Sequence, residues 1–176
     1  MKQLIECVPN FSEGRDMGII KQITDEIERI EGVKLLDVDP GKATNRTVVT
    51  FVGEPDVVVE AAYQAMKKAA ELIDMRQHSG EHPRMGATDV CPFIPIANIT
   101  MEETVAYSKQ LGERVGADLG IPIFLYEASA TDARWKNLAN IRSGEYEKME
   151  SKFKQDDYNP DYGPNKLNVT AGVTAI

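Results

Sequence analysis

The chain holds only two histidines, His78 and His82, and both lie within segment 74–86. The same segment contains Arg76, Arg84, two glycines and a proline, a composition that predicts a polar loop rather than core. Histidine titrates near neutrality, so it serves both as a general acid–base and as a metal ligand. A lone histidine is more often a structural residue, but this clustering of cations on a glycine-bearing loop favours a functional site.

The spacing of the two histidines allows a second interpretation. Residues 78–82 read His-Ser-Gly-Glu-His, which matches the H-x-x-E-H pattern of inverted zinc peptidases. That pattern works when a helix places both imidazoles on one face beside a metal-bound water. Gly80 within the motif and Pro83 after it disfavour such a helix, and no further histidine completes a ligand set. A zinc hydrolase using His78 and His82 stays an alternative, while the main expectation is that the chain has no metal site.

Other catalytic patterns are weaker. Neither the glycine-rich phosphate loop nor the dinucleotide-binding fingerprint occurs. Cys91 could form a thiol–imidazole pair with His82, although a cysteine within an apolar strand is more commonly a small buried hydrophobe. Loops 10–15 and 40–46 carry glycines and polar side chains that suit either turns and caps or ligand contacts.

The elements that must hold the histidine loop follow from hydrophobic periodicity. Apolar residues spaced by three and four, such as Ile20, Ile23, Ile27 and Ile30, indicate amphipathic helices. Helices are predicted over 16–31, 55–73 and 100–119, with a broken helical region at 132–154. Strands are predicted over 4–8, 33–38, 47–52, 90–96 and 121–126, with a turn at 39–41 and an extended tail from 157 that ends in a strand.

The order of these elements matches the split βαβ arrangement. We therefore expect an α/β (α+β) chain with a ferredoxin-like mixed sheet and helices packed on one face. Pro92 and Pro95 each lack an N–H group, which places the fourth strand at the edge of the sheet. The histidine loop then connects the second helix to that strand.

The composition describes an ordinary globular protein with an excess of acidic residues. Its 176 residues include 20 Lys and Arg against 28 Asp and Glu, a net charge of −8, and 42% are hydrophobic. This length fits one domain, and the apolar content argues against disorder. The acidic balance argues against nucleic-acid or anionic-membrane partners, and no run approaches the ~20 apolar residues that span a bilayer. Two cysteines and an N-terminus unlike a signal peptide predict a cytoplasmic protein.

Several segments resemble the formiminotransferase domain of the glutamate formiminotransferase family. They run in the family's order over nearly the whole chain: 6–14 (ECVPNFSEG), 45–48 (NRTV), 50–53 (TFVG), 80–86 (GEHPRMG), 89–95 (DVCPFIP), 142–147 (RSGEYE) and 161–164 (DYGP). The resemblance implies that residues 1–176 form the N-terminal one of two α/β subdomains, whose sheets face each other across a folate-binding passage. The family's C-terminal subdomain then lies outside this chain.

The resemblance implies transfer of a formimino group from N-formiminoglutamate to tetrahydrofolate, giving 5-formimino-tetrahydrofolate and glutamate. Tetrahydrofolate is then the acceptor substrate, and no bound cofactor or metal is implied. The expected partners are these small molecules, a C-terminal subdomain in the complete enzyme and further copies in a homo-oligomer. A folate-binding or regulatory module without turnover stays open as an alternative.

The resemblance also assigns residues, and it places the family's catalytic histidine on His82. An imidazole suits the proton shift between two nitrogens that this transfer requires. Carboxylate clamps and amide contacts to substrate are expected at Asn10, Asn45, Arg46 and Arg84, because guanidinium pairs with carboxylate in bidentate fashion; Arg76 is a further candidate clamp. The family's folate-contacting segment falls on Gly163, Pro164, Asn165, Lys166, Leu167, Asn168, Val169, Thr170, Ala171 and Gly172.

Overall fold

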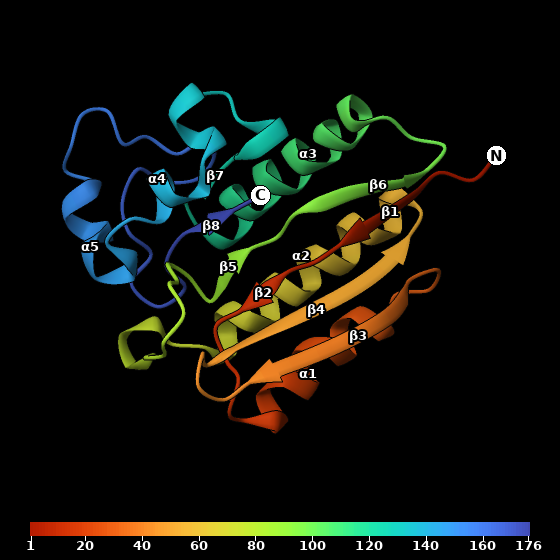
Figure 1. Cartoon of the computed structure of the whole chain (residues 1–176), viewed down its shortest axis with the longest axis horizontal. Helices are drawn as coiled ribbons and strands as arrows, with labels where there is room; N and C mark the ends of the chain where they lie inside the picture. The colour runs from red at the N-terminus through yellow and green to blue at the C-terminus, as the bar shows by residue number, and fades with distance from the viewer.

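A computed structural model describes residues 1–176 and contains one mixed sheet (Figure 1). Its strands are β1 (Leu4–Cys7), β2 (Asn10–Phe11), β3 (Lys34–Gly41), β4 (Arg46–Gly53), β5 (Thr88–Val90), β6 (Phe93–Ala97), β7 (Ile123–Phe124) and β8 (Thr174–Ala175). β4 pairs antiparallel with β3 on one side and with β1 and β2 on the other, and these two pair in turn with β6 and β5. This order is that of the split βαβ sheet, so the predicted topology is confirmed.

Two strands of the sheet are interrupted by a proline: the strand predicted over 90–96 divides into β5 and β6, and β2 follows β1 within the segment 10–15 that was expected to be a loop. Pro9 separates β1 from β2, and Pro92 separates β5 from β6. The breaks lie side by side, because the Val8 amide donates to the Pro92 carbonyl at 3.2 Å. Proline cannot donate to a ladder, so each long strand continues as two short ones.

The prediction that the fourth strand is an edge strand holds only for β6. β8 pairs in parallel with β5 and with β7, so the chain's C-terminal end extends the sheet beyond β5. The Cys91 amide also donates to Ala175 at 2.9 Å, just before Pro92 interrupts the ladder. The C-terminal segment therefore pairs with the β5 half of the expected edge strand. Local sequence patterns do not predict such long-range pairing.

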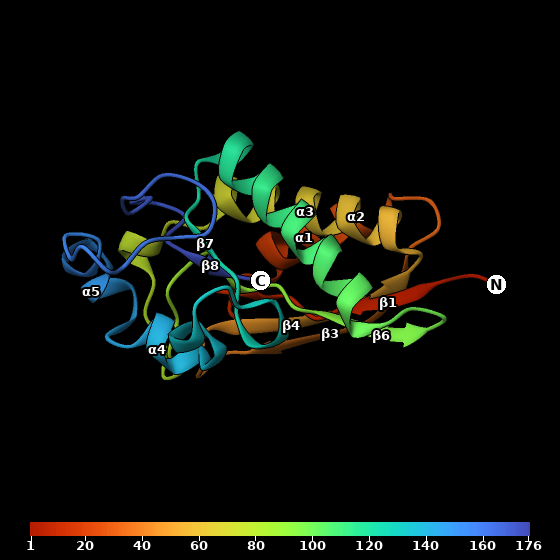
Figure 2. The ribbon, with the colours of Figure 1, turned by 90° about the horizontal axis from the view of Figure 1, so that it is seen from above.

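The three long helices pack on one face of the sheet, as predicted (Figure 2). They are α1 (Met17–Glu28), α2 (Pro55–Leu72) and α3 (Met101–Leu119). Asp16 caps α1, and Thr100 caps α3 by accepting from the Glu103 amide at 3.0 Å. Ile23 and Ile27 are 1% and 0% exposed, which confirms the predicted buried stripe of α1.

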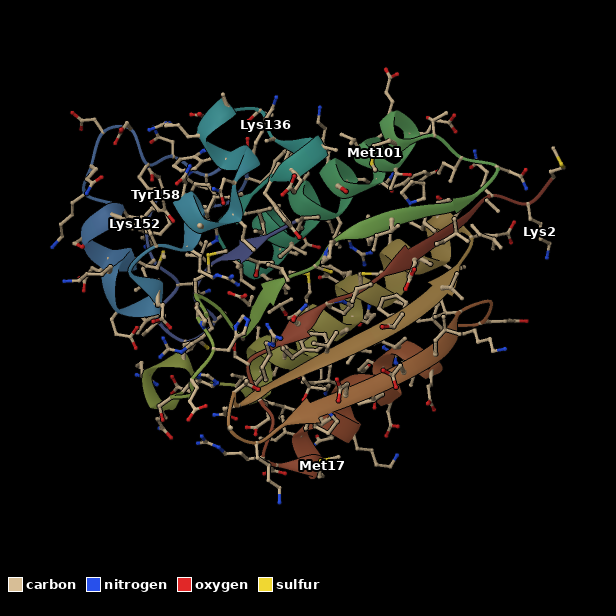
Figure 3. The ribbon with its side chains drawn as sticks, in the orientation of Figure 1. Lys2, Met17, Met101, Lys136, Lys152 and Tyr158 are labelled. Atoms are coloured by element: carbon tan, nitrogen blue, oxygen red, sulfur yellow. The ribbon has the colours of Figure 1, made fainter.

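A second, smaller core lies at the end of the sheet that carries β7 and β8. It is covered by α4 (Leu138–Arg142) and α5 (Glu145–Lys152), which the predicted break separates at Gly144, where φ is +83°. Phe124 meets Trp135 edge-on at 5.4 Å and Tyr158 at a tilt at 4.7 Å between ring centroids. Figure 3 labels Tyr158 beside Lys152, whose ammonium lies 4.6 Å from that ring.

Two strand boundaries differ from the predictions. β3 runs on to Gly41, so Pro40 is paired within the ladder and the turn comes at 42–45 rather than at 39–41. A bulge at Leu36 shifts the register of β3 and restores Val38 to the core side. The strand predicted over 121–126 is reduced to the two residues of β7. No helix of the chain combines the length and the apolar character needed to cross a membrane.

Burial of the α1 stripe predicts a large stability difference between two substitutions. Ile27→Ala should lower the free energy of unfolding by about 2–5 kcal/mol, because it leaves a cavity in the main core. Leu36→Ala removes a similar side chain from the bulge, where Leu36 is 50% exposed, and should change the free energy of unfolding by less than about 1 kcal/mol. Urea unfolding followed by circular dichroism measures both. Equal losses would contradict the packing described here.

Candidate active site

Three loops meet at one end of the sheet: 12–15 after β2, 42–45 between β3 and β4, and the histidine loop 78–84. Their backbones touch. A Cβ atom on Gly80 would lie 2.3 Å from the Thr44 carbonyl oxygen, and one on Gly14 would lie 2.2 Å from that of Gly41. The Glu81 amide donates to Ala43 at 3.1 Å. Only glycine permits this approach, so Gly80 holds the histidine loop, and Gly14 the loop after β2, against the hairpin of β3 and β4.

Asn45 joins all three loops from a left-handed backbone conformation, with φ at +49°. Its side-chain oxygen accepts from the Gly14 amide at 2.9 Å, and its side-chain nitrogen donates to the Ser79 carbonyl at 3.0 Å. Asn45 is also buried. The expected substrate contact is therefore not what its amide does in this structure, where both ends bind the protein's own backbone.

His78 is fixed between the β3–β4 turn and Arg84. Its Nδ1 accepts from the Arg84 Nε–H group at 3.0 Å, and because arginine only donates, this nitrogen carries no proton. The proton is then on Nε2, which donates to the Asn45 carbonyl at 2.8 Å. Burial lowers the pKa of His78, and the charge of Arg84 lowers it further, although the bond to Asn45 opposes both. His78 is thus a neutral anchor of the loop.

Arg84 is buried beneath the loop rather than offered to substrate. Its guanidinium uses all five N–H donors. Nε–H donates to Nδ1 of His78 and one further N–H donates to the His78 carbonyl, while the remaining three donate to Glu145 and Glu147 at the start of α5. Its side chain is 7% exposed. The bond from Arg84 lowers the pKa of Glu147, so this carboxylate stays charged. In this structure the buried, fully engaged guanidinium has no donor left for a substrate carboxylate, and the expected clamp at Arg84 stays a prediction.

His82 has a different surrounding, at the partly exposed edge of the same loop. Its Nδ1 lies 2.7 Å from the Pro83 carbonyl oxygen, and its Nε2 lies 2.5 Å from a guanidinium nitrogen of Arg46. Because a carbonyl only accepts, Nδ1 carries the proton. The same Arg46 nitrogen also lies 3.1 Å from Nδ1, so the guanidinium sits over the imidazole ring rather than on the Nε2 lone pair. Arg46 begins β4, where alternate residues from Thr47 are buried under the helices. Arg46 and His82 therefore meet on the face of the sheet that has no helices.

Asn10, the first residue of β2, lies on that same face. It pairs with Val48, two residues along β4 from Arg46, and its side chain donates to the Val8 carbonyl at 3.2 Å. The structure thus brings Asn10, Arg46 and His82 together on one face. Arg76 is not part of this group, because it is exposed and held in a bidentate pair by Asp74.

The segment 163–172 runs beside the end of the histidine loop. Gly86 bridges Gly172, and the Val173 amide donates to Met85 at 3.0 Å. Gly172 has φ at +73°, and a Cβ there would lie 2.2 Å from the Met85 carbonyl oxygen, so only glycine fits. The two segments that the family resemblance singles out are therefore adjacent in space.

Within 163–172 the backbone is fastened while several side chains remain exposed. Tyr146 donates to the Val169 carbonyl, and the Met75 amide donates to the Thr170 carbonyl at 2.8 Å. Asn168 accepts from the Ala171 amide at 3.0 Å and closes the turn. The exposed residues of the segment are Gly163, Asn165, Lys166, Val169 and Thr170.

Five supporting residues were not identified from sequence. Glu145 and Glu147 hold Arg84, and Ser12 donates to the Gly86 carbonyl at 2.7 Å. Buried Asp89 accepts from the Met85 amide at 2.9 Å and pairs with Arg142 at 2.6 Å; burial raises the pKa of its carboxyl group while Arg142 opposes the rise. The only signal for these contacts was the family resemblance at 6–14, 89–95 and 142–147, which said nothing of their roles.

The zinc alternative lacks the geometry it requires. Residues 78–84 form no helix, and each histidine contacts a different arginine instead of a shared centre. No group of three or more His, Cys, Asp or Glu side chains converges anywhere in the chain. The thiol–imidazole alternative also fails, because buried Cys91 contacts Cys7 at 3.6 Å between sulfur atoms rather than His82.

Residues 4–176 match the family described as the formiminotransferase domain, N-terminal subdomain. This chain belongs to the formiminotransferase family. The match covers every element of the site just described, from β1 through the histidine loop to the segment 163–172.

Relatives within the formiminotransferase family are similar over nearly the full chain. A formimidoyltransferase-cyclodeaminase from Dictyostelium discoideum is 55% identical over 174 residues, covering 99% of this chain and 32% of that protein. Glutamate formimidoyltransferases from Streptococcus pyogenes serotype M1 and Thermoplasma acidophilum are 51% and 46% identical, and the matches cover 59% and 57% of them. The chain therefore spans between about a third and three fifths of these relatives' lengths.

The neutral state of His78 predicts a pH-dependent stability. With the His78 pKa lowered in the folded state, the unfolded chain binds more protons below about pH 6.5, so the free energy of unfolding must rise with pH in that window. Stability should therefore fall between about pH 7 and pH 5. Glutamine keeps a donor and an acceptor but does not titrate, so His78→Gln should flatten this slope.

Urea unfolding at half-unit pH intervals measures the effect. Below about pH 5 the carboxylates held by arginines, such as Glu147, begin to lose their stabilising charge as well, so the comparison is restricted to the higher window. An unchanged slope in the His78→Gln variant would show that His78 is not held neutral by the fold.

Proposed function

We propose that this chain is the N-terminal part of an enzyme that transfers a formimino group from N-formiminoglutamate to tetrahydrofolate, giving 5-formimino-tetrahydrofolate and glutamate. Family membership and relatives named glutamate formimidoyltransferase support the reaction class. The observation that carries the proposal is the placement of His82: its Nδ1 donates to the Pro83 carbonyl, its Nε2 has no acceptor in the chain, and its loop lies beside the segment 163–172.

The reaction needs a proton carrier and no change of oxidation state. N5 of tetrahydrofolate forms a bond to the formimino carbon, and the C–N bond to the glutamate nitrogen then breaks. The proton lost by N5 must reach the departing nitrogen. His82 Nε2 accepts that proton and returns it to the leaving amine, so the imidazole ends as it began. Tetrahydrofolate is consumed as the acceptor substrate, and the chemistry requires neither a metal nor a further cofactor.

Both substrates are anions, and the site offers cations for their carboxylates. Arg46 lies next to His82 and forms no ion pair with the chain's own carboxylates. Lys166 is exposed on the segment 163–172, where it is free to meet the carboxylates of the folate tail. Asn10 lies on the same face as Arg46 and supplies an amide for the amidine or pterin nitrogens. Because these groups surround one imidazole, binding would also orient the reacting atoms.

The uncovered face of the sheet suits a second subdomain. Alternate residues of β4 are only partly buried there, including Val48 and Val52, and Ile96 of β6 is 51% exposed. An apolar sheet face is commonly covered by another layer. The relatives' additional length supplies one, and we propose that their second subdomain packs its sheet over this face and completes the folate passage. Without that layer the chain would bind folate with little or no turnover. A cytoplasmic homo-oligomer remains a prediction.

The test of the proposed function is His82→Ala in the complete protein. Removing a general acid–base lowers kcat by about 10²–10⁴-fold, while folate affinity should stay within a few-fold. The matched control is His78→Gln, which keeps the loop anchor and should retain most of the turnover, whereas two zinc ligands would be equally sensitive. Stopped assays of 5-formimino-tetrahydrofolate formation measure both. Near-parental turnover by His82→Ala would refute the assignment.

A further inference from the structure

A cavity of about 310 Å³ lies between the histidine loop and the junction of α4 with α5. Its volume is at the lower end of the range of small-molecule sites, roughly 300–1,000 Å³. Figure 2 shows α4 at the level of the sheet and away from the layer of α1, α2 and α3. The Pro83 carbonyl accepts from Nδ1 of His82, and Pro83 also lines the cavity, so the cavity is next to the proposed proton carrier. Its walls are formed by Pro83, Ala139, Arg142, Ser143, Gly144 and Glu145.

Arg142 presents one free edge of its guanidinium to this cavity. Its Nη1 donates to buried Asp89 at 2.6 Å, which fixes the side chain. The other edge, formed by Nε–H and Nη2–H, has no hydrogen-bond partner in the chain. These nitrogens are not sealed in the core, since Thr88 Oγ1 is the only buried side-chain polar atom without a partner. Two parallel N–H groups on one guanidinium edge are the arrangement that binds a carboxylate with two hydrogen bonds.

Glu145 brings a carboxylate oxygen without a partner to the same cavity. Its Oε1 accepts from the amide and the guanidinium of Arg84 at 3.3 and 3.0 Å, whereas Oε2 accepts from no group of the chain. The side chain is 40% exposed, so Oε2 can be reached by a ligand. The cavity therefore offers a pair of donors for an anion and an acceptor oxygen for a cation.

N-formiminoglutamate carries both of these charges. Its amidine is a strong base and is therefore an amidinium cation at neutral pH, while its two carboxylates are anions. The glutamate tail of folate has carboxylates without a neighbouring cation. No residue of the segment 163–172 lines the cavity either. The charges of the cavity therefore fit the amino-acid donor better than they fit folate.

We propose that this cavity is the binding site for N-formiminoglutamate, in which the free edge of Arg142 binds a carboxylate and Oε2 of Glu145 faces the amidinium. The formimino carbon then lies next to His82, and both contacts are charge-assisted. This assignment rests on the proposed function and deepens it, because it names the residues that select the donor.

Arg142→Lys tests the carboxylate contact in the complete protein, with KM measured separately for each substrate. Lysine keeps a cation beside Asp89, so the buried ion pair remains, but it removes the two-bond edge. KM for N-formiminoglutamate should rise about 10–100-fold, the loss expected for charged hydrogen bonds, with KM for tetrahydrofolate within a few-fold. A rise in KM for tetrahydrofolate instead, or a fall in kcat with both KM values unchanged, would overturn the assignment.

Glu145→Gln tests the amidinium contact, because it removes the charge and keeps an oxygen that accepts from Arg84. KM for N-formiminoglutamate should again rise by about 10-fold or more. The matched control is Glu147→Gln, which also takes a carboxylate from Arg84 but does not line the cavity. Its KM for the donor should stay within a few-fold of the parent value. Equal rises in the two variants would show that the effect passes through Arg84 and would overturn the role of Glu145.

Glutarate separates the two contacts without any turnover. It has both carboxylates of the donor and no amidinium, so its affinity, measured by calorimetry, should fall about 10-fold in Arg142→Lys and should not fall in Glu145→Gln. No binding to the parent protein, or equal binding to Arg142→Lys, would overturn the carboxylate contact. If the complete protein showed no formimino transfer, the proposed function would fail, while the glutarate titration would still decide whether Arg142 binds a carboxylate.

Discussion

Arg84 carries a permanent charge into the junction between the histidine loop and α5, and the geometry of the site depends on how that charge is satisfied. Its five donors end on His78, Glu145 and Glu147. A buried charge that lost such partners would cost several kcal/mol, so the loop and the start of α5 must form together. α5 in turn begins where Gly144 adopts positive φ, which brings both glutamates to the guanidinium. From Arg84 the contacts continue through His78 and Asn45 to Gly14.

This network gives two histidines of one loop opposite roles. His78 is locked by an arginine on one ring nitrogen and a backbone carbonyl on the other, within the buried side of the loop. His82, four residues on, is held by its neighbouring carbonyl and meets only Arg46 on the open face. A proton-transfer site needs a rigid anchor beside an accessible imidazole. The reactive ring must be held in position while one of its nitrogens stays available for proton transfer.

Local sequence patterns predicted many of the helices and strands but few of the hydrogen bonds and ion pairs in the site. The isoleucine spacing of α1 and the break in the helical region 132–154 depend on near neighbours, and both are confirmed. The histidine loop was likewise evident from its composition. The return of β8 to the sheet and the burial of Arg84 depend on residues more than 60 positions away, which periodicity does not report. Arg84 and Asn45 were therefore expected at the substrate, although both bind the protein itself.

The account's central claim is that the histidine loop and the segment 163–172 belong to one folate site. Hydrogen exchange in the complete protein, with and without tetrahydrofolate, tests it most directly. Exchange should slow at the exposed amides of 163–170 and in residues 80–84 together, while α1 on the opposite face stays unchanged. Protection elsewhere, with these two segments unaffected, would contradict the claim that they form the folate site.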